Sequence, residues 1–336
     1  MTGHEAGSGQ QTDDRDSVAQ HGASMAREHY TSLIHACRSL APLRTAIVHP
    51  CDESSLEAAI AATRDGLIEP LLVGPRARIQ ELADRSGIDL TKVELIDALH
   101  SNAAAEQAVA LARQGTVQAL MKGSLHTDEL MSEVVRHDKG IRTGRRISHV
   151  FIMDVPTYPK PLFITDAAVN LFPTLEEKVD IVQNAIDLAM ALGLKRPKVA
   201  ILSAVETITS RIPSTLDAAA LCKMADRGQI TGAALDGPLA LDNAIDAAAA
   251  KTKHIRSEVA GDADILVVPS LEAGNMLVKE LTFLANAEAA GIVLGAKVPI
   301  ILTSRADSVR ARLASCAVAV LYAHERYVEP RIPPRV

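Results

Sequence analysis

Aromatic residues are scarce in this chain. Phe, Trp and Tyr together make up 2% of its 336 residues, and Trp is absent. Hydrophobic residues nevertheless reach 48%, so the core must be packed from Ala, Val, Ile and Leu, as in parallel strands covered by Ala-rich helices. The shortage of aromatic rings argues against binding of single-stranded nucleic acid by base stacking.

Basic clusters and long apolar runs are also missing. The formal net charge is −6, and without a basic block we expect no nucleic-acid partner and no anionic membrane surface. No apolar run reaches the about 20 residues of a transmembrane helix, and the first residues lack the basic and apolar regions of a signal peptide. The sequence therefore predicts a soluble, cytoplasmic protein.

Cysteine is rare, and its spacing predicts neither disulfides nor a zinc site. The four cysteines contain no CxxC pair and no Cys/His pairing at zinc spacing, so we expect free thiols in a reducing cytosol. Asp262 and Asp264 resemble a carboxylate pair for a metal, but Asp264 begins an expected strand in which neighbouring side chains point apart. We therefore expect no metal site. The cysteines are Cys37, Cys51, Cys222 and Cys316.

Apolar strand-like runs alternate with Ala-rich helical stretches from about residue 44 onward. One series covers residues 45–49, 70–73, 93–96 and 118–121, and a second covers residues 149–153, 161–165, 198–202, 230–235 and 264–269. This alternation predicts β-α-β units and parallel sheets. The strands are too many for one open sheet of ordinary size, which favours two sheets.

We therefore expect an α/β protein with two αβα domains and a cleft between them. Residues 1–28, rich in Gly, Gln, Asp and Ser, predict a disordered tail. The first domain is expected to comprise residues 29–148 and 295–336, and the second residues 149–294. The hinge is expected near residues 145–150, and the return to the first domain around residues 291–298.

Two predicted helices begin with the spacing of a capping box. Ser54 precedes Glu57 by three residues, and Thr174 precedes Glu177 by the same interval. In this arrangement the hydroxyl and the carboxylate each accept a backbone N–H of the first turn. The two pairs therefore predict helix starts at these positions.

Polar or basic residues follow three of the expected strands. Lys122 and Gly123 follow the first, Gly274 and Asn275 follow the second and lead into a helix that carries Lys279, and the segment 303–305 follows the third. Each segment places helix-start N–H groups beside a cation or a small polar side chain, which favours phosphate binding. The alternative interpretation is that these residues only form turns and caps.

Other motifs are weaker. Lys122 lacks the GxxxxGK[ST] context of a nucleotide P-loop, and no GxGxxG follows the first strand. Arg142, Arg145 and Arg146 form a basic turn that either binds phosphates or is merely solvated. No His, Cys and acid set has the spacing of a known triad.

Several ordered blocks stand out within residues 43–323. They are Met121-Lys-Gly, Ser148-His-Val, Ala204-Val-Glu-Thr207, Asp236-Gly-Pro-Leu-Ala-Leu-Asp-Asn243, Gly261-Asp-Ala-Asp-Ile-Leu-Val-Val-Pro269, Glu272-Ala-Gly-Asn275 and Thr303-Ser-Arg-Ala-Asp-Ser308. Together they resemble the phosphate acetyltransferase and phosphate butyryltransferase family, and most closely its short, butyryltransferase-like branch.

The resemblance implies a fold similar to that of isocitrate and isopropylmalate dehydrogenases and a homodimer formed through the second domain. It also implies transfer of an acyl group between coenzyme A and inorganic phosphate, with coenzyme A as substrate and no permanently bound cofactor, metal or nicotinamide. Arg305 is then expected to contact the phosphate and Ser304 the reacting centre, with Gly274 and Asn275 facing them.

One position departs from the family pattern. Acetyltransferases of the family carry an Asp seven residues after the Ser, proposed to take the thiol proton, and this chain has Ala311 there. Asp307 is the nearest replacement, either as a catalytic acid or as a cap of the last helix. Lys122, Gly123, Arg142 and Lys279 are expected to bind the phosphates of coenzyme A or the acyl phosphate.

The expected function is a phosphate acyltransferase with a direct ternary-complex mechanism and a preference for acetyl groups. Phosphate butyryltransferase activity is the alternative. More remote alternatives are a metal- and NAD(P)-dependent decarboxylating dehydrogenase of the same fold and a non-catalytic coenzyme A-binding protein.

Overall fold

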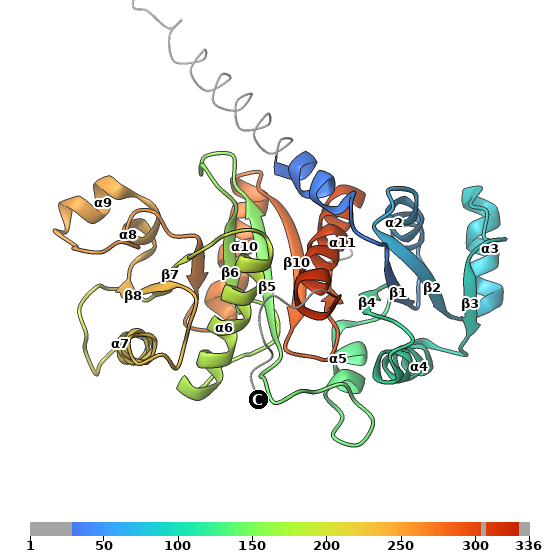
Figure 1. Cartoon of the computed structure of the whole chain (residues 1–336), viewed down its shortest axis with the longest axis horizontal. Coiled ribbons are helices and arrows are strands. Elements are labelled where there is room, and N and C mark those ends of the chain that lie inside the picture. Colours follow the sequence, from blue (N-terminus) through green and yellow to red (C-terminus); the bar gives the residue numbers. More distant parts are fainter. Residues whose placement is uncertain (1–28, 304–306, 329–336) are drawn as a thin grey trace, which may run out of the picture.

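Hydrogen bonds join the strands of the described chain into one eleven-stranded sheet with the order β3-β2-β1-β4-β11-β10-β5-β6-β9-β7-β8. The computed structural model describes residues 29–303 and 307–328. The sheet runs along the long axis of the molecule, with β3 near one end and β8 near the other (Figure 1). The strands are β1 (Leu43–Val48), β2 (Ile68–Gly74), β3 (Glu94–Asp97), β4 (Ala119–Lys122), β5 (Ser148–Asp154), β6 (Leu162–Thr165), β7 (Lys198–Leu202), β8 (Ala234–Leu239), β9 (Ile265–Val267), β10 (Glu288–Leu294) and β11 (Ile300–Ile301).

The expectation of two separate sheets is wrong. β10 pairs antiparallel with both β5 and β11, and β11 pairs parallel with β4, so the ladder continues from one half of the sheet into the other. The chain does come back from β10 to a strand beside β4, in the first half of the sheet. The domain boundaries themselves remain a prediction.

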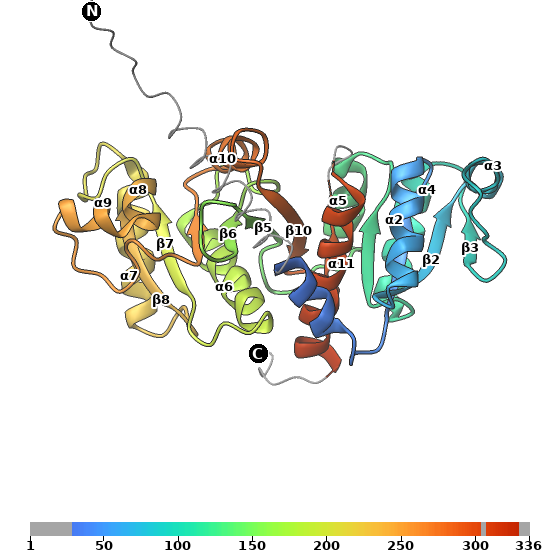
Figure 2. The same ribbon diagram turned by 90° about the horizontal axis from the view of Figure 1, so that it is seen from above.

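Helices cover both faces of the sheet, and three apolar clusters fill the two layers between them. The largest cluster lies under the helical residues 29–37 and under five further helices: α2 (Glu53–Arg64), α3 (Arg76–Ser86), α6 (Leu175–Ala191), α7 (Pro213–Asp226) and α11 (Val309–Ala323). A short π-helix, His324–Val328, extends α11. The opposite face carries α4 (Ser101–Gln114), α5 (Thr127–Val135), α8 (Leu241–Ile245), α9 (Ala247–Thr252) and α10 (Leu271–Leu284). Figure 2 shows α6 and α11 on one side and α5 and α10 on the other.

Local sequence explains most helix starts, with one correction. The Oγ1 atom of Thr174 accepts the N–H of Glu177, and the Glu177 carboxylate accepts the N–H of Thr174 at 2.9 Å, which confirms that capping box. The box at Ser54 is wrong, because Asp52 caps α2 by accepting the N–H of Ser55 at 2.8 Å. An aspartate is as good an N-cap as a serine, and it stands earlier in the chain.

One strand lies later in the sequence than expected. A strand was predicted over residues 230–235, but β8 covers Ala234–Leu239. Gly232 adopts a φ of +91°, a left-handed conformation that is incompatible with extended backbone. The strand therefore begins only after this glycine. Of the predicted strand, only residues 234–235 belong to β8, so its predicted bounds are wrong.

All four cysteines lie in the described part of the chain and are free thiols, as predicted.

Asp262 and Asp264 both form ion pairs with Lys160. The lysine Nζ lies 2.7 Å from the Asp262 carboxylate and 2.6 Å from the Asp264 carboxylate. Among the described helices, none combines the length and the apolar character needed to cross a bilayer.

Candidate active site

A cavity of about 680 Å³ lies on the face of the sheet that carries α5 and α10. Its walls come from the end of β4, the start of α5, one side of α10, the start of β10, residues 302–303 after β11, and residues 307–308 with Ala311 at the start of α11. The polar groups on its lining are Lys122, His126, Thr127, Asn275, Lys279, Thr282, Glu288, Thr303, Asp307 and Ser308. We call it the polar cavity.

The polar cavity brings together four of the residues that the sequence singled out. Lys122 and Asp307 come from the first half of the sheet, and Asn275 and Lys279 come from α10 in the second half. Lys122 on β4 and Lys279 on α10 both bring positive charge to its lining. Such an arrangement suits a phosphorylated, anionic ligand.

Lys122 owes its position to its strand. It is the last residue of β4, between β1 and β11, and only 4% of its surface is exposed. Behind it, Ser124 Oγ donates to the carbonyl of His49 and accepts the N–H of Cys51, which fixes the turn after β4 to the turn after β1. A buried ammonium at the carboxyl end of parallel strands is well placed for an anion.

Two glycines predicted to bind substrate have a packing role in the structure. A Cβ on Gly123 would lie 2.5 Å from the carbonyl oxygen of Val48, and one on Gly274 would lie 2.7 Å from Val268. Gly123 therefore lets the turn approach β1, and Gly274 lets α10 approach the sheet. Neither lines the polar cavity, and their contact with substrate remains a prediction.

The basic turn is largely engaged with α6. Arg145 bonds Asp187 at 2.8 Å, and Arg146 lies 2.9 Å from Glu177. Arg142 is exposed and does not line the polar cavity. Ser304 and Arg305 lie outside the described residues, so their predicted roles also remain predictions.

Asp307 does not cap the last helix. Ser308 is the N-cap of α11, and its Oγ accepts the N–H of Ala311 at 3.1 Å. The alternative role of Asp307 as that cap is therefore wrong. Asp307 lines the polar cavity one residue before the cap.

Arg312 was missed by the sequence analysis. It is 2% exposed, and its Nη1 donates to Thr303 Oγ1 at 3.2 Å while its Nη2 donates to Ser54 Oγ at 3.3 Å. It therefore ties the end of β11 to the start of α2 from beneath the polar cavity. The signal was an arginine inside the otherwise apolar face of α11, since buried arginines are rare unless paired.

His126 and His149 were also missed. His126 lines the polar cavity, and its backbone N–H donates to the Glu129 carboxylate at 2.7 Å. His149 is fully buried, and neither ring nitrogen has a hydrogen-bond partner among the described residues. Burial lowers the pKa of His149 to about 4, although the adjacent Leu302 backbone favours the charged form.

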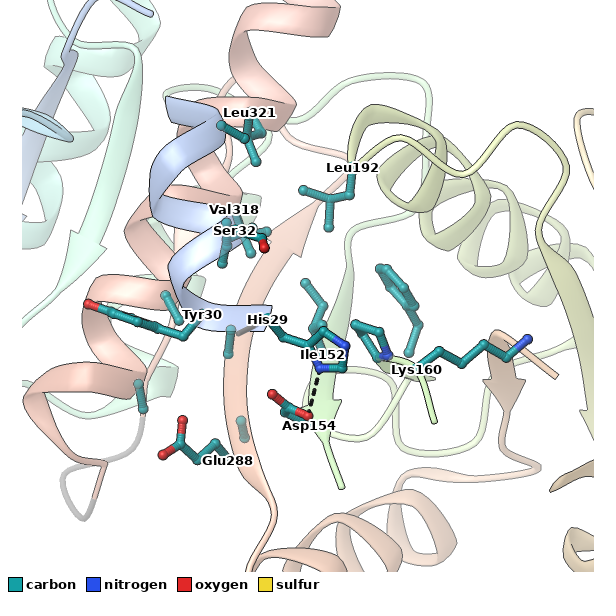
Figure 3. A pocket seen from close by; sticks show the side chains of 18 of the residues that line it. His29, Tyr30, Ser32, Ile152, Asp154, Lys160, Leu192, Glu288, Val318 and Leu321 are labelled. Atoms are coloured by element: carbon teal, nitrogen blue, oxygen red, sulfur yellow. Dashed lines mark hydrogen bonds and ion pairs between the residues drawn. The ribbon is translucent and has the colours of Figure 1, made fainter. Parts of the chain in front are cut away.

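A second cavity, of about 370 Å³, lies on the opposite face of the sheet (Figure 3). Its walls are mainly aliphatic, and its polar rim contains the His29–Asp154 pair at 3.1 Å and Lys160. We call it the apolar cavity. Glu288, Ala289 and Ala311 line both cavities.

Comparison with known proteins gives consistent matches. A family model described as phosphate acetyl/butaryl transferase matches residues 101–320. A phosphate acetyltransferase of Rhizobium meliloti is 65% identical over 297 residues, which cover 88% of this chain and 94% of that protein. A phosphate butyryltransferase of Clostridium acetobutylicum is 40% identical over 294 residues, which cover 88% of this chain and 98% of that protein.

The fold comparison agrees. The crystal structure of a branched-chain phosphotransacylase from Enterococcus faecalis V583 is similar with a TM-score of 0.71 at 30% identity. The match covers 84% of this chain and 99% of that one. The α/β class with its mixed sheet is thus shared with a solved transacylase.

Proposed function

This chain belongs to the phosphate acetyltransferase and phosphate butyryltransferase family, and we propose that it transfers an acyl group, preferentially acetyl, between coenzyme A and inorganic phosphate. One observation carries the proposal. Lys122 at the end of β4 and Lys279 on α10 line a single cavity together with Thr303 and Asp307.

The reaction needs what this cavity contains. In the direction of acyl-CoA synthesis, the coenzyme A sulfur attacks the carbonyl carbon of the acyl phosphate, a C–S bond forms, the C–O bond to phosphate breaks, and phosphate leaves with the electron pair. Lys122 and Lys279 stabilise the phosphate charge. Arg305 binds the leaving phosphate and Ser304 contacts the reacting centre, as the family resemblance implies.

The thiol proton needs an acceptor, because a thiol with a pKa near 8.5 is mostly protonated at neutral pH. Two side chains in the described lining of the polar cavity are candidate proton acceptors. They are Asp307, next to the N-cap of α11, and His126, at the start of α5. We assign the role to Asp307, since it lies in the same short segment as Thr303 and replaces the acid missing at Ala311. His126 is the competing acceptor.

A direct transfer without an acyl-enzyme agrees with the state of the cysteines. Burial raises the pKa of Cys37, Cys222 and Cys316 to about 12 and also raises the pKa of Cys51. A thiol of such high pKa is a poor nucleophile at neutral pH. None of the four lines the polar cavity.

The proposal includes two α/β domains with the polar cavity between them, a homodimer and a cytoplasmic location. Exposed apolar side chains on α10 support the dimer. Met276, Phe283 and Leu284 are 64%, 72% and 80% exposed, and Leu171 and Phe172 are also exposed beside the start of this helix. Such a patch on a protein surface favours a subunit contact.

The decisive experiment measures acyl transfer directly. Purified protein is incubated with acetyl-CoA and phosphate, and release of the free thiol is followed with a thiol reagent. We expect turnover, and Arg305→Ala should lose about 10²-fold or more in kcat, as for loss of one transition-state contact. Turnover close to that of the unsubstituted enzyme would remove Arg305 from the mechanism.

Two controls separate the competing functions. A stable acyl-protein detected by mass spectrometry after incubation with acetyl-CoA alone would contradict direct transfer. A change in NAD(P)H absorbance with 2-hydroxy acids would indicate a dehydrogenase. Calorimetric binding of coenzyme A without any thiol release from acetyl-CoA and phosphate would indicate a binding protein.

A further inference from the structure

The buried guanidinium of Arg312 donates to two hydroxyl groups at once. Its Nη1 donates to Thr303 Oγ1 at 3.2 Å, and its Nη2 donates to Ser54 Oγ at 3.3 Å. An arginine side chain has donors and no acceptor, so each hydroxyl oxygen can only accept from it. The proton of each hydroxyl group is therefore left for donation to another group.

The two hydroxyl groups differ in where this proton goes. Ser54 Oγ donates to Asp52 Oδ1 at 3.1 Å. Thr303 Oγ1 has no acceptor for its proton among the residues that the structure describes. Thr303 is only 3% exposed, and it lines the polar cavity. Because buried hydroxyl groups are almost always hydrogen-bonded, we expect the acceptor to be a ligand in that cavity.

Thr303 lies at the same edge of the sheet as Lys122. β11 pairs parallel with β4, with Ile301 opposite Met121. Lys122 is the next residue on β4, and Thr303 stands two residues after Ile301. Both line the polar cavity, and the ammonium of Lys122 favours a negatively charged ligand oxygen there. An oxygen of a phosphate group meets this requirement better than the uncharged carbonyl oxygen of an acyl group.

We propose that Thr303 binds the phosphate group by donating its hydroxyl proton to a phosphate oxygen, and that Arg312 is the positioning residue for this hydroxyl. The inference rests on the proposed acyl transfer, in which phosphate is a substrate in one direction and the leaving group in the other. Arg312 does not belong to the described lining of the polar cavity, so it acts on phosphate through Thr303. By occupying the threonine oxygen as a donor, it directs the hydroxyl proton away from itself.

The first test removes the hydroxyl group alone. Thr303→Val keeps the shape of the side chain, and KM for phosphate should rise about tenfold or more, as for loss of a hydrogen bond to a charged group. KM for acetyl-CoA should change little. Thr303→Ser retains a hydroxyl group and should recover most of the loss. Steady-state kinetics with acetyl-CoA and phosphate measure these values.

Two results of this test would overturn the inference. One is an equal KM for phosphate in Thr303→Val and Thr303→Ser. The other is a lower kcat of Thr303→Val with KM for phosphate unchanged, because this result would place the hydroxyl group on the reacting carbonyl.

Thr45→Val is the matched control. Thr45 is a buried threonine of β1, its hydroxyl group donates to the carbonyl of Leu43 at 2.8 Å, and it does not line the polar cavity. Its replacement should leave KM for phosphate at the wild-type value. A rise in KM equal to that of Thr303→Val would overturn the inference, because the effect would then arise from general packing.

A double-mutant cycle tests the role of Arg312. Arg312→Met should raise KM for phosphate several-fold in the wild type and add little in the Thr303→Val background, since residues that act through one another are not additive. An equal rise in both backgrounds would overturn the positioning role. If Arg312→Met does not fold, the same cycle is measured with Arg312→Lys, which keeps the charge but lacks the planar fork that holds two hydroxyl groups.

The two proposals can fail separately. If the wild type transfers no acyl group, the proposed function fails. Calorimetric titration with inorganic phosphate then tests Thr303 without turnover. Weaker binding by Thr303→Val than by the wild type and Thr303→Ser is the expected result. Equal binding by all three proteins, or no phosphate binding by the wild type, would overturn the inference.

Discussion

The imidazole of His149 occupies the space in which a side chain at Gly291 would lie. A Cβ built on Gly291 would be 2.9 Å from Nε2 of His149 and 2.7 Å from the carbonyl oxygen of Leu302. The ring also packs against Phe151 in a tilted arrangement, with 4.2 Å between the centroids and 55° between the ring planes. Phe151 and Leu302 both line the polar cavity, so this contact supports the floor of the proposed active site.

Gly291→Ala is expected to destabilise the protein by about 1–3 kcal/mol, as for overpacking of a filled core. Because the added methyl group would push against the Leu302 backbone, kcat should fall as well. Urea unfolding and the acyl-transfer assay measure the two effects. Gly144→Ala is the matched control, since its Cβ would meet nothing within 4 Å. Equal stability of the two variants would contradict the packing argument.

The neutral state of His149 predicts a pH dependence of stability. The unfolded chain binds the proton with a pKa near 6.5 and the folded chain with a pKa of about 4, so acidification between these values favours unfolding. The stability of the wild type should fall by about 3 kcal/mol relative to His149→Phe across this window. Above pH 6.5 the difference should be constant.

Urea unfolding of both proteins at several pH values gives this difference directly. Taking the difference is necessary because burial raises the pKa of Asp166, and that carboxyl group contributes a stability change of the opposite sign. Parallel stability curves for the two proteins would show that His149 does not titrate as inferred.

Lys122→Met should weaken phosphate binding. A charge-assisted hydrogen bond is worth about 1.5–3 kcal/mol, so KM for phosphate should rise by roughly 10- to 100-fold. Lys279 is exposed, and its replacement by Met should have a smaller effect that salt reduces further. Lys139→Met is the control, because this exposed lysine lies outside the cavity and pairs with Glu106. Equal KM values for Lys122→Met and the control would exclude Lys122 from the site.

Asp307→Asn should lower kcat by about 10²-fold in the direction that consumes free coenzyme A, since a proton acceptor typically contributes 10²–10⁴-fold. Asn has nearly the same size but cannot take the proton. His126→Asn should have the smaller effect, and His137→Asn, at an exposed histidine outside the cavity, should have none. If His126→Asn caused the larger loss and removed the acidic limb of the pH–rate profile, the role would pass to His126.

The strand and helix pattern was largely readable from the sequence, because it depends on interactions between near neighbours. Runs of buried aliphatic residues marked the strands, and the capping box at Thr174 and Glu177 marked the start of α6. Errors arose where two local signals compete. Asp52 and Ser54 are both good caps, and only the path of the chain after β1 decides between them.

The number of sheets could not be derived in the same way. Whether β10 bridges the two halves depends on pairing of Ile292 with Ile301 on one side and with Val150 on the other. Val150 is far from Ile292 in sequence, and local propensity carries no information about such a distant pairing. The expectation of two sheets failed for this reason.

Motif residues identified the family and placed Lys122, Asn275, Lys279 and Asp307 in one candidate site, because strand ends and helix starts are local features. The sequence alone did not reveal the hydrogen bond from Arg312 to Thr303, the fit of His149 against Gly291, or the position of Ala311 in the lining of two cavities. Each of these depends on which distant side chains compete for the same space, and that is decided only when the sheet and its two helical layers pack together.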